Sequence, residues 1–153
     1  MTLSRQVTRE PGSLTGDAVR SPTIPDASFP SFVLGQADMR GDKRALIEAS
    51  TGRELTYPEL AASVREVAGG LAAQGVAAGD VLAMCTPNSI ELIVAFYAAL
   101  SLGASVTVSN PESTRDEIVR ELVESGARWL VTTVELFEHK LQAAARETRI
   151  IET

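Results

Sequence analysis

Apolar residues recur every three or four positions over residues 60–71, a spacing that predicts an amphipathic helix. The helix should begin after Thr56, because Thr56 and Glu59 have the spacing of a capping box, in which each side chain bonds the other residue's backbone N–H. It should end at Gly75, since glycine readily adopts the left-handed conformation that closes many helices. The glycine pair 69–70 lies inside this helix, where we expect it to allow close packing at some cost in helix stability.

A second predicted helix, over residues 89–102, is apolar on every side, and a helix of that kind is buried. Asn88 is its expected N-cap and Gly103 its expected end. Short apolar runs of strand length precede and follow it, over residues 81–85 and 105–108. A helix joined to two strands by so few residues predicts a βαβ unit, and therefore a parallel sheet.

The rest of the chain continues this alternation of helices and strands. Thr114 and Glu117 form a second capping box, and the helix that they open should end at Gly126. The residues of this helix expected to face the core are Ile118, Val119, Leu122 and Val123. The other predicted elements are a short helix over 31–39, a hairpin of 44–48 with 54–55, a strand over 129–131, a helix over 134–146 and a strand that opens at 150–151.

These elements predict an α/β fold in three layers, with a mostly parallel sheet built from βαβ units. Residues 1–28 are rich in proline, serine, threonine and glycine and hold few large apolar groups, so we expect a mobile N-terminal arm. The folded part should span residues 29–153. Because the sequence stops soon after its last strand begins, we expect an incomplete N-terminal portion of a larger domain, with an unfinished sheet edge through which chains can associate.

The composition narrows the expected partners and compartment. The formal net charge is −6, whereas nucleic acids and anionic membranes bind basic surfaces, so neither is an expected partner. A single cysteine excludes an internal disulfide framework and agrees with a reducing compartment. The first residues lack the apolar core of a secretory signal, and we therefore expect a cytoplasmic protein.

One stretch invites a different interpretation. Residues 92–110 carry no charged side chain and are about as long as a membrane-spanning helix. Only residues 92–102 are strongly apolar, however, and Gly103 interrupts the run before polar and apolar residues begin to alternate. A buried helix followed by a strand explains the stretch better than a transmembrane segment.

We expect no catalytic, cofactor-binding or metal-binding residue in this chain, because the glycine-rich phosphate motifs and the nucleophile elbow are absent. Cys85 ends an apolar strand and should be a buried, inert thiol. His139, the only histidine, falls on the polar side of its helix and should be solvated. The acidic residues of the third long helix alternate with arginines and should form a solvated face with helical ion pairs. They are Asp116, Glu117, Glu121 and Glu124.

The turn at Ser109, Asn110 and Pro111 is the one positional hint of a binding site. It follows the carboxyl end of a predicted parallel strand, which is where open α/β sheets bind ligands. Taken alone, the residues indicate an α/β domain and no particular reaction.

A series of short motifs resembles the N-terminal part of AMP-forming acyl-CoA synthetases, in the branch of 4-coumarate–CoA ligases, fatty-acyl-CoA ligases and luciferases. The resemblance runs from about residue 29 to the end and rests on the order and spacing of the motifs. They are Leu-Thr-Tyr-Pro-Glu-Leu at 55–60, Gly-Val at 75–76, Gly-Asp-Val at 79–81, Pro-Asn-Ser at 87–89 with Glu91, Leu-Gly-Ala at 102–104, Asn-Pro at 110–111 and Ser-Gly-Ala-Arg at 125–128.

This resemblance implies an enzyme that adenylates a carboxylic acid with ATP and Mg²⁺ and then transfers the acyl group to coenzyme A, for example in fatty acid metabolism. It also implies that the phosphate loop, the Mg²⁺-binding segment and the catalytic lysine lie beyond residue 153. The chain should therefore hold no cofactor and be inactive alone.

Two other interpretations of the function stay open. In the first, the chain is a non-catalytic, adenylation-like module that binds a partner. In the second, it is one half of a split enzyme. A small nucleotide-binding protein is disfavoured, because the sequence lacks a glycine-rich phosphate loop.

Overall fold

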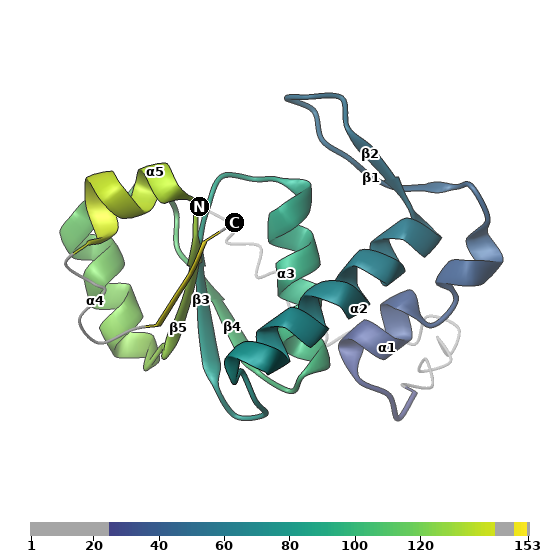
Figure 1. Cartoon of the computed structure of the whole chain (residues 1–153), viewed down its shortest axis with the longest axis horizontal. Helices are drawn as coiled ribbons and strands as arrows, with labels where there is room; N and C mark the ends of the chain where they lie inside the picture. The colour runs from purple at the N-terminus through teal and green to yellow at the C-terminus, as the bar shows by residue number, and fades with distance from the viewer. Residues whose placement is uncertain (1–24, 143–148, 153) are drawn as a thin grey trace, which may run out of the picture.

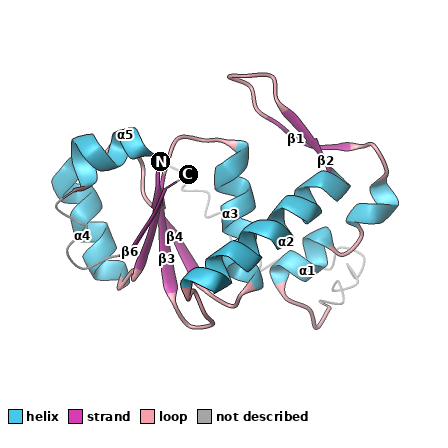
Figure 2. Cartoon of the chain, viewed as in Figure 1, coloured by secondary structure: helices cyan, strands magenta, loops and turns pink. Residues whose placement is uncertain are grey.

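A computed structural model of the chain describes residues 25–142 and 149–152. Its centre is a four-stranded sheet in the order β4-β3-β5-β6, and every neighbouring pair of strands is parallel (Figures 1 and 2). The predicted parallel arrangement of the segments 81–85, 105–108 and 129–131 is thus confirmed. The strands are β3 (Val81–Cys85), β4 (Ser105–Val108), β5 (Trp129–Thr132) and β6 (Arg149–Glu152).

Helices cover both faces of this sheet, which gives the three predicted layers (Figure 1). Helices α2 (Tyr57–Gln74) and α3 (Ile90–Ser101) lie on one face. On the other face lie α4 (Arg115–Ser125), the single turn α5 (Val134–Leu136) and the π-helical turn η2 (Phe137–Leu141).

Alternate residues of each strand divide the core into two halves, because successive side chains of a strand point to opposite faces. Leu82 and Met84 join the cluster beneath α2 and α3, and Ala83 and Cys85 join the cluster beneath α4. All four side chains are fully buried. Burial on both faces explains why the sequence of β3 is continuously apolar and does not alternate between polar and apolar residues.

A separate antiparallel hairpin, β1 (Arg44–Ile47) with β2 (Glu54–Thr56), stands away from the main sheet beside the start of α2 (Figure 1). It confirms the predicted hairpin. The chain enters it through α1 (Phe29–Leu34) and the 3₁₀ turn η1 (Ala37–Arg40). Of the predicted arm, residues 1–24 lie outside the described residues.

Both predicted capping boxes are present. Thr56 opens α2 and Thr114 opens α4, each by accepting from the backbone N–H of the glutamate three residues on. Gly75 and Gly126 end these helices in the left-handed conformation, as predicted. The predicted cap of α3 is wrong by one residue, since the Ser89 hydroxyl, and not Asn88, accepts from Leu92 N.

Two predicted helices differ from the continuous α-helices that their apolar patterns suggested. The segment expected as one helix over 31–39 is α1 followed by η1, because Ser28 caps α1 early and the chain leaves the α-helical path near Gly35. The helix expected over 134–146 begins as α5 and widens into η2, while residues 143–148 fall outside the described part of the chain.

Three expectations about packing are wrong. Gly69 and Gly70 are exposed, and a Cβ added at either would meet no atom within 4 Å, so they permit no close approach. Val123 is 64% exposed and does not face the core. In α3 only one side is fully buried, while Ile93 and Phe96 are half-buried.

Candidate functional site

The strand order creates a switch point at the carboxyl ends of β3 and β5. The chain leaves β3 through α3 to reach β4 on one side, and it then crosses through α4 to β5 on the other side of β3. Open α/β sheets bind ligands in the crevice that such a reversal opens. The residues that follow the two strands here are Thr86 and Thr133, one strand away from the turn that the sequence suggested.

Two hydroxyl groups lie at this edge, and each makes a hydrogen bond to a backbone atom close to it in the sequence. Thr86 Oγ1 donates to Pro87 O over 2.7 Å, and Thr133 Oγ1 accepts from Leu136 N at the start of α5. Neither arrangement activates a nucleophile, because no histidine or carboxylate is bonded to either hydroxyl in the described contacts. These two threonines therefore offer hydrogen bonds to a ligand and, among their described contacts, no acid–base pair.

The sequence-predicted turn at 109–111 lies at the same end of the sheet. Asn110 Oδ1 accepts from Glu112 N over 2.9 Å, which fixes the turn locally. The ammonium group of Lys140 donates to the backbone oxygens of Pro111 and Ser113, so this cation tethers the turn to η2. Lys140 therefore acts here as a structural clamp.

Cys85 is fully buried at the end of β3, as predicted. Burial raises the pKa of its thiol, because the thiolate would lose its hydration among the apolar side chains beneath α4. The thiolate is the nucleophilic form of cysteine. Its position therefore makes Cys85 a packing residue.

The remaining candidates lie on the surface. His139 is exposed on η2, as predicted, and so are the four acidic residues of α4. The pKa of Glu117 is lowered, because the Thr114 hydroxyl and backbone N–H donate to its carboxylate in the capping box. Within the described residues, no three histidine, cysteine, aspartate or glutamate side chains gather closely enough to hold a metal ion.

An ion network that the sequence analysis missed joins the hairpin to α3. Arg53 forms a two-pronged pair with Glu48, with nitrogen–oxygen distances of 3.0 and 2.9 Å, and a second with Glu91 at 2.7 and 2.9 Å. Glu48 is 9% exposed and also accepts from Ile90 N, at the first turn of α3. These donors, with the Thr51 hydroxyl, lower the pKa of Glu48 to about 2. The network fixes the hairpin against the amino end of α3.

Asp80 is a second missed residue, at the amino end of β3. Its carboxylate accepts from Ala77 N at 3.0 Å, from the Arg128 guanidinium at 2.8 Å and from the Trp129 indole at 3.2 Å. The pKa of Asp80 is lowered, chiefly by the Ala77 N–H. The sequence signal for this site was the Gly-Asp pair before an apolar run. It could not identify the side-chain partners of Asp80, because Arg128 and Trp129 lie 48 and 49 residues further along the chain.

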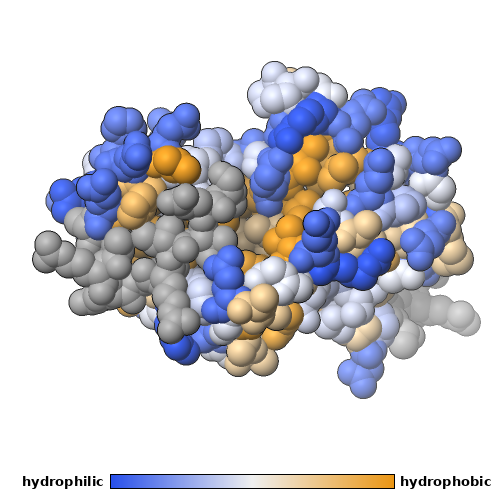
Figure 3. All heavy atoms as spheres, viewed as in Figure 1, coloured by the Kyte–Doolittle hydropathy of each residue, from blue (hydrophilic) through white to orange (hydrophobic). Residues whose placement is uncertain are grey.

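A groove of about 730 Å³ opens between the hairpin, α2 and α3, over β5. Its interior is apolar, and Figure 3 shows apolar surface gathered between these elements. Its charged lining comprises Arg53 and three glutamates, and Arg53 is already paired. A carboxylate or a triphosphate would therefore find no unpaired cation in this lining, which argues against the groove as the site for either. The glutamates are Glu54, Glu66 and Glu91.

Comparison with known proteins decides the family. The sequence pattern of the family described as AMP-binding enzyme matches residues 34–153. The chain belongs to this family. Among curated relatives, it is 36% identical over 127 residues to 4-coumarate--CoA ligase 5 of Oryza sativa subsp. japonica, and 37% identical over 130 residues to peroxisomal OPC-8:0-CoA ligase 1 of Arabidopsis thaliana. These matches cover 79% and 85% of this chain but 24% and 23% of the relatives.

Solved structures agree with this assignment to the AMP-binding enzymes. The benzoate CoA ligase of Burkholderia xenovorans LB400 superposes with a TM-score of 0.74 at 26% identity, over 83% of this chain and 26% of that one. The luciferase-like enzyme of the mealworm Zophobas morio gives 0.77 at 24% identity, over 87% and 32%, which shows the shared fold. The resemblance drawn from the motifs is confirmed, and the chain spans about a quarter of the length of the curated relatives it matches.

The alternative of a transmembrane segment finds no support in the described residues. No helix there combines the length and the apolar character needed to cross a membrane. The stretch over 92–110 comprises most of α3, then β4 and the following turn, as the favoured interpretation predicted.

Proposed function

We propose that this chain is the N-terminal part of an ATP-dependent, AMP-forming acyl-CoA ligase. The complete enzyme would join a carboxylic acid to ATP, releasing pyrophosphate, and would then transfer the acyl group from AMP to the thiol of coenzyme A. The observation that carries the proposal is the family match over residues 34–153, together with CoA ligases among its relatives.

The chain's own part in this reaction is to build and position one side of the sheet. We assign it no catalytic, cofactor-binding or metal-binding residue, and the hydroxyls of Thr86 and Thr133, which follow β3 and β5, are engaged in a turn and a helix cap. ATP, Mg²⁺ and coenzyme A would bind to the remainder of the enzyme. Catalysis of this kind depends on holding the reacting groups in line and stabilising developing charge, and we infer that a chain matching 24% of its relative's length does not do so alone.

Experiments on the isolated chain test the proposal that it neither binds ATP nor catalyses the reaction by itself. Calorimetric titration with ATP and Mg²⁺ should show no specific binding, and an acyl-CoA assay with 4-coumarate, benzoate and a medium-chain fatty acid should show no turnover. Micromolar ATP affinity or turnover above background would contradict the proposed division of roles and require a nucleotide site within the chain.

A chimera tests the proposal that the chain serves as the N-terminal part of a ligase. Residues 34–153 would replace the matched segment of the Oryza sativa 4-coumarate--CoA ligase 5, to which the chain is 36% identical. Recovery of acyl-AMP and acyl-CoA formation supports a ligase segment. A chimera that folds, by its melting transition, but forms neither product favours a non-catalytic module that binds a partner.

The same proposal places the protein in the cytoplasm. Its support is the single cysteine, buried and unpaired in the structure, which suits a reducing compartment. Fractionation of the source cells with antibody detection measures the location directly, and detection in a membrane or secreted fraction would contradict it.

A further inference from the structure

The side of β4 that faces away from β3, here called the β4 edge, is open in the described part of the chain. β4 stands at the end of the strand order, and among the described residues only β3 pairs with it. The backbone N–H groups of Ser105 and Ser109 donate to carbonyl oxygens at or next to the two ends of β3, over 2.8 and 2.9 Å. Alternate residues of a strand direct their backbone groups to opposite sides. The N–H and C=O groups of Val106 and Val108 therefore face outward, where another strand can pair with them.

The β4 edge lacks the features with which natural proteins block pairing between edges. Such features are charged side chains, especially lysine, and proline. Residues 104–109 contain neither, and the valine and threonine of β4 are residue types that favour strands. Val108, at the end of β4, is 59% exposed. The edge is therefore able to accept a further strand.

The sequence of the β4 edge is the same when it is read backward. Residues 105–109 are Ser-Val-Thr-Val-Ser, with Thr107 at the centre. When two copies of this segment pair antiparallel about a two-fold axis at Thr107, valine lies opposite valine and serine opposite serine. The outward-facing Val106 then exchanges hydrogen bonds with Val108 of the second copy, and the two Thr107 residues form a non-hydrogen-bonded pair. The edge is thus complementary to itself, as a two-fold interface requires.

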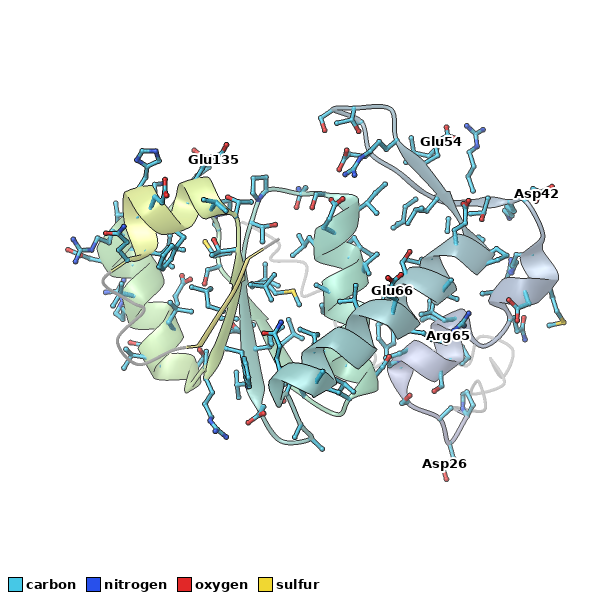
Figure 4. All side chains as sticks on the ribbon, viewed as in Figure 1. Asp26, Asp42, Glu54, Arg65, Glu66 and Glu135 are labelled. Carbon is cyan, nitrogen blue, oxygen red and sulfur yellow. The ribbon has the colours of Figure 1, made fainter. Side chains whose placement is uncertain are left out.

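The distribution of charge favours a second copy of the chain as the partner. The formal net charge of −6 opposes a general association of two copies. Charged side chains lie on the hairpin and the helices, for example Glu54, Glu66 and Glu135 (Figure 4). Residues 92–110, which include β4, carry no charged side chain. Two copies can therefore pair at the β4 edge without placing the carboxylates of one strand against those of the other.

We propose that the β4 edge is the interface of a homodimer, in which the β4 strands of two copies pair antiparallel about a two-fold axis at Thr107. The two sheets then form one continuous sheet across the axis. This interface lies at the opposite edge of the sheet from β6, the last strand. The proposal is independent of the ligase assignment, so a chimera that forms no acyl-CoA would leave it standing.

Sedimentation velocity of the 153-residue chain measures the association. A strand of four residues makes a small interface, so we expect a reversible dimer with a Kd on the order of 100 μM. Val108→Lys places an ammonium group on the edge and should weaken the dimer at least about tenfold. Val123→Lys makes the same change at a position on α4 that is 64% exposed, and it should leave the Kd unchanged. Both variants alter the net charge equally, and circular dichroism melting verifies that each one folds.

Cross-linking tests the register of the two strands. In a non-hydrogen-bonded antiparallel pair the Cα atoms lie about 4.5 Å apart, a distance that a disulfide spans. Thr107→Cys should therefore give a disulfide-linked dimer on oxidation with copper phenanthroline. Ser105→Cys is the control, because its two copies would lie about 13 Å apart at a rise of about 3.3 Å per residue. Cys85 is fully buried and should form no cross-link, which oxidation of the unmodified chain verifies.

Three results would overturn the proposal. They are the absence of a dimer at about 1 mM protein, equal weakening by Val108→Lys and Val123→Lys, and cross-linking of Ser105→Cys that equals or exceeds that of Thr107→Cys. The first excludes association of two copies through this edge. The second indicates an effect of net charge, and the third indicates a different register or another surface of contact.

Discussion

The indole N–H of Trp129 donates to the carboxylate of Asp80 over 3.2 Å, joining residues 49 positions apart. Trp129 begins β5 and Asp80 immediately precedes β3, so the bond spans the amino ends of two paired strands. Asp80 is only 8% exposed and also holds the N–H of Ala77 in the turn after α2. One carboxylate thus ties the entry turn of β3 to its neighbouring strand.

Removal of this carboxylate should destabilise the sheet. In Asp80→Ala, the Ala77 N–H and the Trp129 indole N–H lose the carboxylate that accepts their hydrogen bonds. Because the site is buried, water does not replace these bonds, and the free energy of unfolding should fall. Asp80→Asn keeps one acceptor oxygen and should lower the melting temperature by less. Thermal unfolding followed by Trp129 fluorescence measures both, and equal stability of all three proteins would contradict the role.

The network around Glu48 predicts a specific loss of stability in acid. Its pKa falls from 4.5 to about 2 in the folded chain, chiefly because Arg53 donates to its carboxylate. A carboxyl group whose pKa is lowered by folding contributes stability above its unfolded pKa and loses that contribution as pH falls toward its folded pKa. The contribution of Glu48 should therefore be complete above pH 4.5 and disappear between pH 4.5 and 2.

Urea denaturation at several pH values between 2 and 7 tests this expectation, since those limits bracket both pKa values of Glu48. In Glu48→Gln, the fall in stability between pH 4.5 and 2 should be shallower. Glu124→Gln removes the same charge from an exposed position on α4 and should keep the slope of the unmodified protein. Parallel pH profiles for Glu48→Gln and the unmodified protein would refute the coupling.

Two residues of helix α4, one buried and one exposed, allow the stability that core packing contributes to be measured against a control. Ile118 is fully buried beneath the sheet, whereas Val123 on the same helix is 64% exposed. Ile118→Ala should cost about 2–5 kcal/mol through lost apolar contact and a residual cavity. Val123→Ala should change the free energy of unfolding by about 0.5 kcal/mol or less. Chemical denaturation measures both, and similar costs would mean that Val123 is packed against another surface.

Replacement by alanine should change the stability in opposite directions at Gly69, which lies inside α2, and at Gly75, which ends it. Gly69 has space for a Cβ inside the helix, so Gly69→Ala should stabilise the protein by about 0.5–1 kcal/mol. Gly75 ends the helix at φ 102°, where a side chain is strained, and Gly75→Ala should destabilise it by about 1–2 kcal/mol. Melting temperatures of the two variants check the signs, and a destabilised Gly69→Ala would restore a packing role for that glycine.

The sequence alone determined the elements whose signals are local. Capping by Thr56 and Thr114 involves residues three positions apart, and the left-handed ends at Gly75 and Gly126 depend on backbone geometry at one residue. The apolar runs and short connections predicted the parallel sheet, because such strands need cover on both faces. The family, too, was readable from the order and spacing of short motifs, as the match over residues 34–153 confirms.

Only the tertiary structure decided which polar groups meet and which apolar faces stay open. Glu48 and Ile90 N lie 42 residues apart, and no spacing rule brings a strand-end glutamate to the first turn of a later helix. The apolar pattern of α3 likewise could not reveal that Ile93 and Phe96 would be half-buried. Hydrophobic patterning records that a side chain prefers to leave water, while the surface that covers it depends on how whole elements pack. The groove between the hairpin, α2 and α3 exists for that reason, because its walls come from elements far apart in the chain.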